Sequence, residues 1–188
     1  MIANRQSGWK GACLYGRTRR AGNNMADKPK NSRHEKRVSA FKLLFAREFN
    51  KDADPVELYN AFLYDEAGEN GELKLNKEYS SEYVKETYFG AVEKLGEIDA
   101  DIESTSIKWK LSRMSVPTRT VLRLAVYELL YTDTPPKVVI NEAIDIIREY
   151  DDETAPAFVN GILNKIARSH GIIAEPQKTA GDVPHETI

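Results

Sequence analysis

The chain has 188 residues, of which 41% are hydrophobic and 30% are charged, as is usual for a soluble globular protein with one hydrophobic core. Its single cysteine, Cys13, excludes an intramolecular disulfide, and no apolar run reaches the roughly 18 residues that a membrane-spanning helix needs. We therefore expect a soluble, cytoplasmic protein.

The formal net charge of -2 hides an uneven distribution. Residues 1–37 carry ten Lys or Arg and only two acidic residues, whereas the rest of the chain carries 17 basic and 27 acidic residues. A basic segment on an acidic body can add affinity for nucleic acids, although charge alone fits a solvated tail that binds nothing equally well. We predict that residues 1–32 are disordered. Residues 1–24 have no periodic pattern and precede Met25, which has the character of a natural start, so they would be a mis-called start.

Helical patterns begin at residue 33. Residues 33–49 place apolar side chains three and four positions apart, which predicts an amphipathic helix. Asp54 and Pro55 are typical of the first turn of a second helix. The segment 65–72 is acidic and contains two glycines, and we expect it to form a polar surface loop.

The middle of the chain predicts one long helix and one short helix. A broad apolar stripe runs from Ser80 or Ser81, either of which can cap the helix, to about Glu103. A short helix is expected around residues 107–111. The next helix begins near Val116 and is apolar on most sides, so it should lie at the centre of the fold.

Two further helices complete the predicted domain. Pro135 and Pro136 end the central helix, and apolar residues then recur over 138–147 and again over 158–166. No useful strand alternation is present. We predict an all-α fold, a single compact helical bundle of about seven helices over residues 33–170, followed by a disordered tail over 171–188.

Sequence signatures of enzymes are missing. The chain has no glycine-rich phosphate loop, no nucleophile elbow and no Cys or His cluster at the spacing of metal ligands. The three histidines lie in or near the termini, where a preorganised catalytic pair is not expected. We therefore predict a protein that is not an enzyme and needs no metal or cofactor.

The start of the first helix has the residues of a phosphate-binding site. Helical spacing puts Arg33 and Arg37 on one face, with Lys36 beside them. Such a cluster can neutralise successive phosphates and release their counterions, which gives affinity that depends on salt. The alternative is a solvated helix start, although cations there oppose the helix dipole.

Polar residues within the last two helices need an explanation. Gly161 lies inside a helix at a cost of about 0.5–1 kcal/mol relative to alanine, which predicts close approach of another backbone. Asn141 and Asn160 are expected to tie their helices to neighbours by hydrogen bonds. Phe158, at the start of the last helix, is either a core residue or a platform on which an RNA base stacks.

Four segments together resemble the NusB family of transcription antitermination proteins. They are KVVINEAI at 137–144, FVNGIL at 158–163, RVSAFKLLF at 37–45 and VLRLAVYEL at 121–129. The resemblance covers residues 33–167 in the same order. It implies an all-helical RNA-binding factor without catalytic activity. Proteins of this family pair with the small-subunit ribosomal protein called NusE, bind the boxA element of nascent single-stranded RNA and join the RNA polymerase elongation complex, notably on ribosomal RNA operons.

The resemblance also assigns roles to single positions. Arg33, Lys36 and Arg37 match the RNA-binding helix start of the family, Phe158 matches an aromatic residue near the RNA, and Lys137 is a candidate phosphate contact. The residues in segments that would face the ribosomal protein are Phe45, Phe49, Arg119 and Arg123. His34 and Glu35 interrupt the arginine-rich segment. The alternative function is a helical protein–protein interaction module without RNA recognition of its own.

Overall fold

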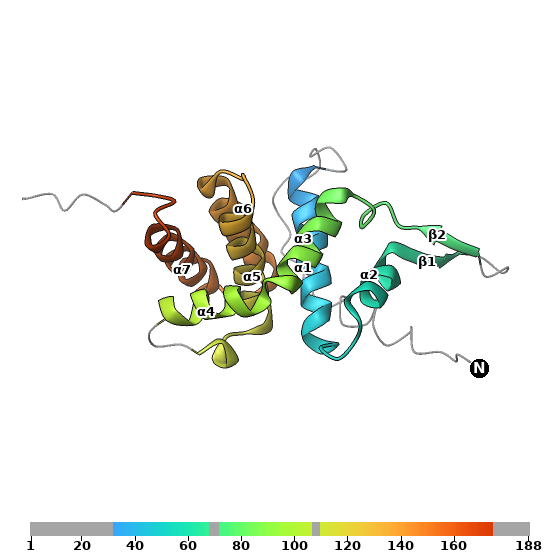
Figure 1. The fold of residues 1–188 in the computed structure, drawn as a ribbon, viewed down its shortest axis with the longest axis horizontal. Coiled ribbons are helices and arrows are strands. Elements are labelled where there is room, and N and C mark those ends of the chain that lie inside the picture. Colours follow the sequence, from blue (N-terminus) through green and yellow to red (C-terminus); the bar gives the residue numbers. More distant parts are fainter. Residues whose placement is uncertain (1–31, 68–71, 107–109, 175–188) are drawn as a thin grey trace, which may run out of the picture.

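The computed structural model describes residues 32–67, 72–106 and 110–174. In this part of the chain seven α-helices form a bundle, which confirms the predicted all-α fold (Figure 1). The helices are α1 (Arg33–Phe49), α2 (Pro55–Leu63), α3 (Glu82–Glu93), α4 (Leu95–Thr105), α5 (Val116–Tyr131), α6 (Pro136–Tyr150) and α7 (Ala155–Ser169).

Side-chain oxygens cap the first turns of several helices. Asp54 accepts hydrogen bonds from the Val56 and Glu57 amides at the start of α2, as predicted, and Ser81 caps α3. Ser32 caps α1 and forms a capping box with Glu35, a signal that the sequence also contains. Each such cap contributes about 1 kcal/mol and fixes the residue at which its helix begins.

The predicted long helix over residues 81–103 is wrong, because the chain bends at Lys94. This residue has φ -90° and ψ 9°, and it ends α3 and precedes α4. The bend lets the two helices reach different neighbours: α3 packs on α1 and α5, whereas α4 packs on α5 and α7. Ile98 and Ile102 of α4 are thereby fully buried.

Two short strands form a β-hairpin where the sequence predicts a polar loop over residues 65–72. Strand β1 (Tyr64–Ala67) pairs antiparallel with β2 (Glu72–Leu75), with Tyr64 opposite Leu75. Residues 68–71 lie outside the described part of the chain. The prediction of no strands is therefore wrong for this segment, where four-residue strands give too short an alternation to recognise.

The short helix predicted around residues 107–111 falls mostly on residues outside the described part of the chain. Residues 107–109 lie outside the described residues, and a single 3-10 turn, η3, covers Leu111–Arg113. Pro117 then lies in the first turn of α5, which is capped by Ser115. Within the described residues 110–115, the 3-10 turn η3 is the helical structure that precedes α5.

Helix α5 is the centre of the bundle. It packs against α1, α3, α4, α6 and α7, and Figure 1 shows it between α1 on one side and α7 on the other. Val121, Leu122 and Val126 of α5 are fully buried, and burying a side chain of this kind contributes about 1.5–3 kcal/mol. The prediction of a central helix is confirmed. The hairpin and α2 lie at the opposite end of the molecule from α7.

The ordered domain extends slightly beyond its predicted limits. Ser32 belongs to it as the cap of α1. After α7, Gly171 adopts φ 68°, and the amides of Gly171 and Ile172 donate to the carbonyls of Arg168 and Ala167. The side chains of Ile172 and Ile173 pack against the core. The predicted disorder of residues 1–31 and 175–188 lies outside the described residues. No helix among the described residues is long and apolar enough to cross a membrane.

Candidate nucleic-acid interface

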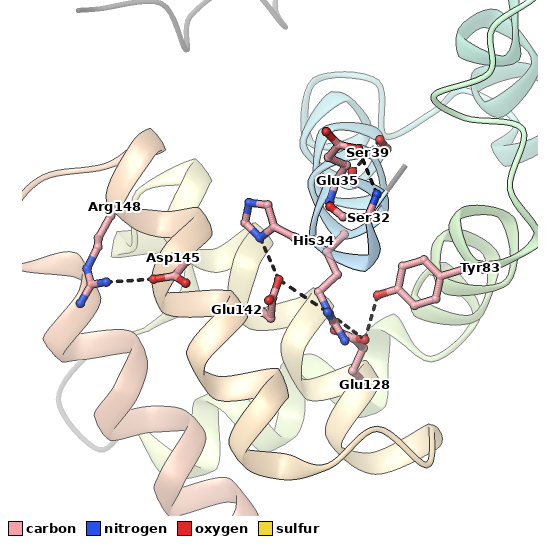
Figure 2. A network of polar contacts seen from close by, with 10 residues as sticks. Ser32, His34, Glu35, Ser39, Tyr83, Glu128, Glu142, Asp145 and Arg148 are labelled. Atoms are coloured by element: carbon pink, nitrogen blue, oxygen red, sulfur yellow. Dashed lines mark hydrogen bonds and ion pairs between the residues drawn. The ribbon is translucent and has the colours of Figure 1, made fainter. Parts of the chain in front are cut away.

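The start of α1 presents two cations at the surface. Arg33 is exposed, and its guanidinium carbon lies 4.6 Å from the ring centroid of Tyr83 on α3. Lys36 is partly exposed one turn along α1. The capping box of Ser32 and Glu35, drawn in Figure 2, fixes the residue at which this turn begins.

Arg37 lies in the interior instead of at this surface. Its Nε donates to Oε1 and Oε2 of Glu128 at 3.1 and 2.8 Å, and both side chains are only 2% exposed. Its Nη1 lies 3.5 Å from Oε2 of Glu142 on α6. Burial alone would lower the pKa of Arg37, but the hydrogen bond and charge of Glu128 raise it, so the guanidinium stays protonated. This placement argues against the predicted RNA contact of Arg37 and gives it a structural role.

Polar side chains from four helices form a network around this buried pair. The hydroxyl of Tyr83 donates to Oε1 of Glu128 at 2.8 Å, and Nδ1 of His34 lies 2.8 Å from Oε2 of Glu142. Burial and the charge of Glu128 raise the pKa of Tyr83 well above its usual value, so it stays a hydrogen-bond donor. Figure 2 shows these side chains converging from α1, α3, α5 and α6. The network holds the start of α1 against the rest of the bundle.

Phe158 lines a surface cavity of about 370 Å³ at the start of α7. Its ring packs partly against the core and partly lines this cavity, and its role as a platform for an RNA base stays a prediction. The wall opposite comes from η3 and the start of α5, where Oδ2 of Asp151 accepts from the hydroxyl of Thr118 at 2.7 Å and from the hydroxyl of Ser115. The other lining residues are Arg113, Met114, Asp152, Thr154 and Ala155.

Lys137 is exposed but does not join Phe158. It lies in the first turn of α6, and a turn of four residues connects α6 to α7. Two packed helices joined by so short a turn run antiparallel, so the starts of α6 and α7 are at opposite ends of the pair. The structure therefore does not bring these two candidate RNA contacts together.

The predicted partner-binding residues differ in accessibility. Phe49, at the end of α1, is 57% exposed, and its ring centroid is 5.2 Å from that of Phe45, which packs partly on the core. Arg119 and Arg123 instead share Glu48: Nε of Arg119 donates to its Oε2 at 2.5 Å, and Nη1 of Arg123 donates to Oε1.

Asp99 completes this second ion cluster. Nε and Nη2 of Arg123 donate to its two carboxylate oxygens, each at 2.7 Å. The cluster joins α1, α4 and α5, and Arg123 is 13% exposed. Both predicted arginines are therefore engaged within the chain, and the aromatic pair is the part of this surface that remains available.

The structural roles predicted for Asn141, Asn160 and Gly161 are wrong. All three residues are exposed, and a Cβ added at Gly161 would meet no atom within 4 Å. The side chain of Asn160 accepts from Nδ2 of its own-helix neighbour Asn164 at 2.8 Å. A glycine or asparagine within a helix predicts a close contact only where it is buried, whereas these three residues are exposed on α6 and α7.

Sequence reasoning also missed the network around Arg37. Tyr83 falls within the apolar stripe predicted from Ser80 or Ser81 to Glu103, and Glu128 falls within the predicted central helix. The available signal was Glu128 itself, because a carboxylate within a central, otherwise apolar helix needs a cationic partner. The sequence alone could not say which of 27 Lys and Arg residues supplies it.

Comparisons with known proteins agree with this arrangement. The model of the NusB family matches residues 34–168. The chain is 38% identical over 138 residues to the transcription antitermination protein NusB of Pediococcus pentosaceus, covering 73% of this chain and 98% of that protein. It is 36% identical to the NusB protein of Ruminiclostridium cellulolyticum, covering 82% and 93%.

Solved structures show the same similarity. A crystal form of T. maritima NusB has 39% sequence identity and a TM-score of 0.61, covering 74% of this chain and 92% of that one. A chain from a crystal structure of the antitermination factors NusB and NusE in complex with double-stranded RNA has 30% identity and a TM-score of 0.58, covering 73% and 96%.

Proposed function

The chain belongs to the NusB family, and we propose that it is a transcription antitermination factor that binds boxA-type single-stranded RNA together with the small-subunit ribosomal protein NusE. In this role it acts in the cytoplasm at the RNA polymerase elongation complex and promotes transcription of ribosomal RNA. The observation that carries the proposal is the similarity to a NusB chain solved with NusE and RNA, combined with the surface at the start of α1.

The proposed RNA contacts lie in two places, the exposed start of α1 near the end of α5 and the cavity beside Phe158 near the start of α5. Arg33 and Lys36 supply positive charge, and a partly exposed aromatic ring supplies a face for a base. The sequence places seven more Lys or Arg and one acidic residue in positions 1–31, directly before this surface. Arg37 contributes by holding α1 in place and is not a member of the contact set.

The exposed aromatic pair at the end of α1 is a candidate binding surface for the protein partner. Large exposed aromatic side chains are common at the centres of protein interfaces. Phe49, supported by Phe45, fits this role. Arg119 and Arg123 are held by Glu48 and Asp99, so we assign them to shaping the surface beneath the ribosomal protein.

The experiment that tests the proposal is a titration of boxA-type RNA with and without the ribosomal protein. The variant Arg33→Ala/Lys36→Ala should weaken RNA binding and reduce the slope of log affinity against log salt by about 1.4, since each phosphate contact to single-stranded RNA contributes about 0.7. Lys85→Ala, which removes an exposed helical lysine on α3, is the matched control. An unchanged slope in the double variant would remove α1 from the RNA surface.

A second measurement separates the two candidate functions. A helical interaction module without RNA recognition would bind the ribosomal protein normally, and the complex would show no preference for boxA-type RNA over a scrambled sequence. For Phe158→Ala, we expect the RNA affinity of the folded protein to fall. If the melting temperature falls while that affinity stays the same, Phe158 is a core residue only.

A further inference from the structure

We propose that the outer faces of α6 and α7 form a second contact surface for RNA, which we name the amide–cation strip. It consists of Lys137, Asn141, Asn160, Asn164 and Arg168. The strip would bind the phosphate–ribose backbone of a single strand that extends beyond the primary surface at α1 and Phe158. This inference rests on the proposed function.

The packing of α7 places two of the amides beside α6. On one flank of α7, Lys165 donates to the carbonyl of Thr105 on α4, and Phe158 faces the start of α5. Asn160 and Asn164 are one turn apart on the opposite flank. Since α7 packs closely against α6 as well, this opposite flank is the one that borders α6.

The packing of α6 gives the matching half of the strip. Glu142 contacts His34, and Glu149 lines a cavity with the same histidine, so this flank of α6 faces α1. At 100° per residue, Lys137 projects from the other flank, and Asn141 lies close to it on the outer side. Lys137 therefore projects on the side of α6 away from α1, and Asn141 projects to solvent beside it.

Because α6 and α7 run antiparallel, residues of the strip on the two helices lie at matching levels along the helix axes. Asn141 lies nine positions before Tyr150, the end of α6, and Asn164 lies nine positions after Ala155, the start of α7. Lys137 and Arg168 are each 13 positions from the same two ends. Residues equally far from a short connecting turn lie at similar heights in a helical hairpin. The two cations therefore flank the strip at one level, and two amides follow at the next.

The polar groups of the strip have bonding capacity to spare. Within the described chain, Lys137 makes no ion pair and the amide of Asn141 makes no hydrogen bond. Arg168 is partly exposed and makes no ion pair among the described residues, although its Nε is buried. The nearby acid Asp145 is paired with Arg148 at 2.9 Å, as Figure 2 shows. The strip thus offers cations and amides without an unpaired carboxylate between them.

The chemistry of the strip favours RNA over a protein. Lys, Arg and Asn side chains are typical phosphate and sugar contacts. A protein interface would be expected to have a large apolar side chain at its centre. Among the described residues, α7 has no exposed large hydrophobic side chain, and α6 has only Val138.

The strip can also be reached from the cavity beside Phe158. Ala157 and Gly161 are exposed on the outer side of α7, between the flank of Phe158 and the flank of Asn160. Open space surrounds Gly161, so a strand that leaves the Phe158 cavity meets no bulky side chain there. Glycine at this position, which costs helix stability, leaves room for that path.

RNA length provides the test. The affinity of the protein, with the ribosomal protein present, is measured for a short boxA-type RNA and for the same RNA extended step by step at either end. We expect extension at one end to raise the affinity of the unaltered protein. The triple variant Lys137→Ala/Asn141→Ala/Asn164→Ala should lose most of this gain, with a fall of about tenfold for the long RNA and less than twofold for the short RNA.

Salt dependence, a matched control and partner binding complete the experiment. Lys137→Ala should lower the slope of log affinity against log salt by about 0.7 for the long RNA and leave it unchanged for the short RNA. Lys85→Ala should change the affinity for neither RNA. If extension adds no affinity, or the triple variant weakens both RNAs equally, the strip is not an RNA surface. Loss of ribosomal protein binding with normal long-RNA affinity would instead assign the strip to a protein. If the unaltered protein does not bind the short boxA-type RNA, the proposed function itself is wrong and not only the strip.

Discussion

The buried pair of Arg37 and Glu128 makes the sharpest prediction about stability. In Glu128→Ala the guanidinium stays 2% exposed but loses both short hydrogen bonds, and Tyr83 loses its acceptor. Removing one partner of a buried ion pair typically costs about 3–5 kcal/mol. Glu142 remains 3.5 Å away and compensates in part, so we expect a loss near the lower end, about 3 kcal/mol.

Chemical denaturation at neutral pH measures this loss as a free energy of unfolding. For a chain of this length, about 3 kcal/mol corresponds to a fall of about 6–12 °C in melting temperature. Asp145→Ala is the control, since it breaks an ion pair whose side chains are 62% and 50% exposed and should cost less than about 1 kcal/mol.

A double variant isolates the charge from the packing. Arg37→Met/Glu128→Leu removes both charges and keeps apolar volume, so it should recover much of the lost stability. Because neither side chain reaches the surface, any change in its RNA affinity measures how far this pair positions the start of α1. Equal losses for Glu128→Ala and Asp145→Ala, or a double variant less stable than either single change, would refute the reasoning.

Three further predictions concern single residues. Gly90→Ala should destabilise the protein by about 1–3 kcal/mol, because its Cβ would overlap the ring of Tyr127; normal stability in denaturation would show that the ring moves aside freely. Gly161→Ala should stabilise it by about 0.5–1 kcal/mol, and a loss there would reveal a contact at this exposed position. Burial raises the pKa of Tyr88 to about 12, and the pKa of Tyr83 is raised as well, so the unfolded chain loses these protons first, near pH 10. Unfolding free energy should therefore fall as the pH rises from about 10 toward 12, and Tyr83→Phe should make the fall shallower; an identical slope in the variant would contradict this.

The helices could be predicted because their signals are local. A helix that buries one face repeats its apolar residues every three or four positions, and residues such as Asp54 and Ser81 mark where it begins. The bend at Lys94 has no such signal, since neither proline nor glycine occupies the position and the apolar stripe continues across it. Only the packing of α4 on α5 and α7 requires the chain to turn there.

The candidate site was harder to predict because it depends on distant pairs. Arg33 and Arg37 look equivalent on a helical projection, yet one is exposed and the other is buried beside a carboxylate 91 positions away. Whether an arginine contacts RNA or holds the fold is decided by what the bundle packs against it. In the same way, Asn141 and Gly161 suggested buried contacts by their type, whereas their location makes them part of a surface.

The polar network around α1 also sets an order of events during synthesis. His34 and Arg37 lie near the beginning of the domain. The partner of His34, Glu142, is 108 positions later in the chain, and the partner of Arg37, Glu128, is 91 positions later. Contacts of such large sequence separation form late, because a long stretch of chain must first be made and closed. A nascent chain without α6 can pack α1 on α2 and α3, but it lacks Glu142, the partner of His34. The complete polar network at the start of α1, beside Arg33 and Lys36, therefore requires the chain through α6.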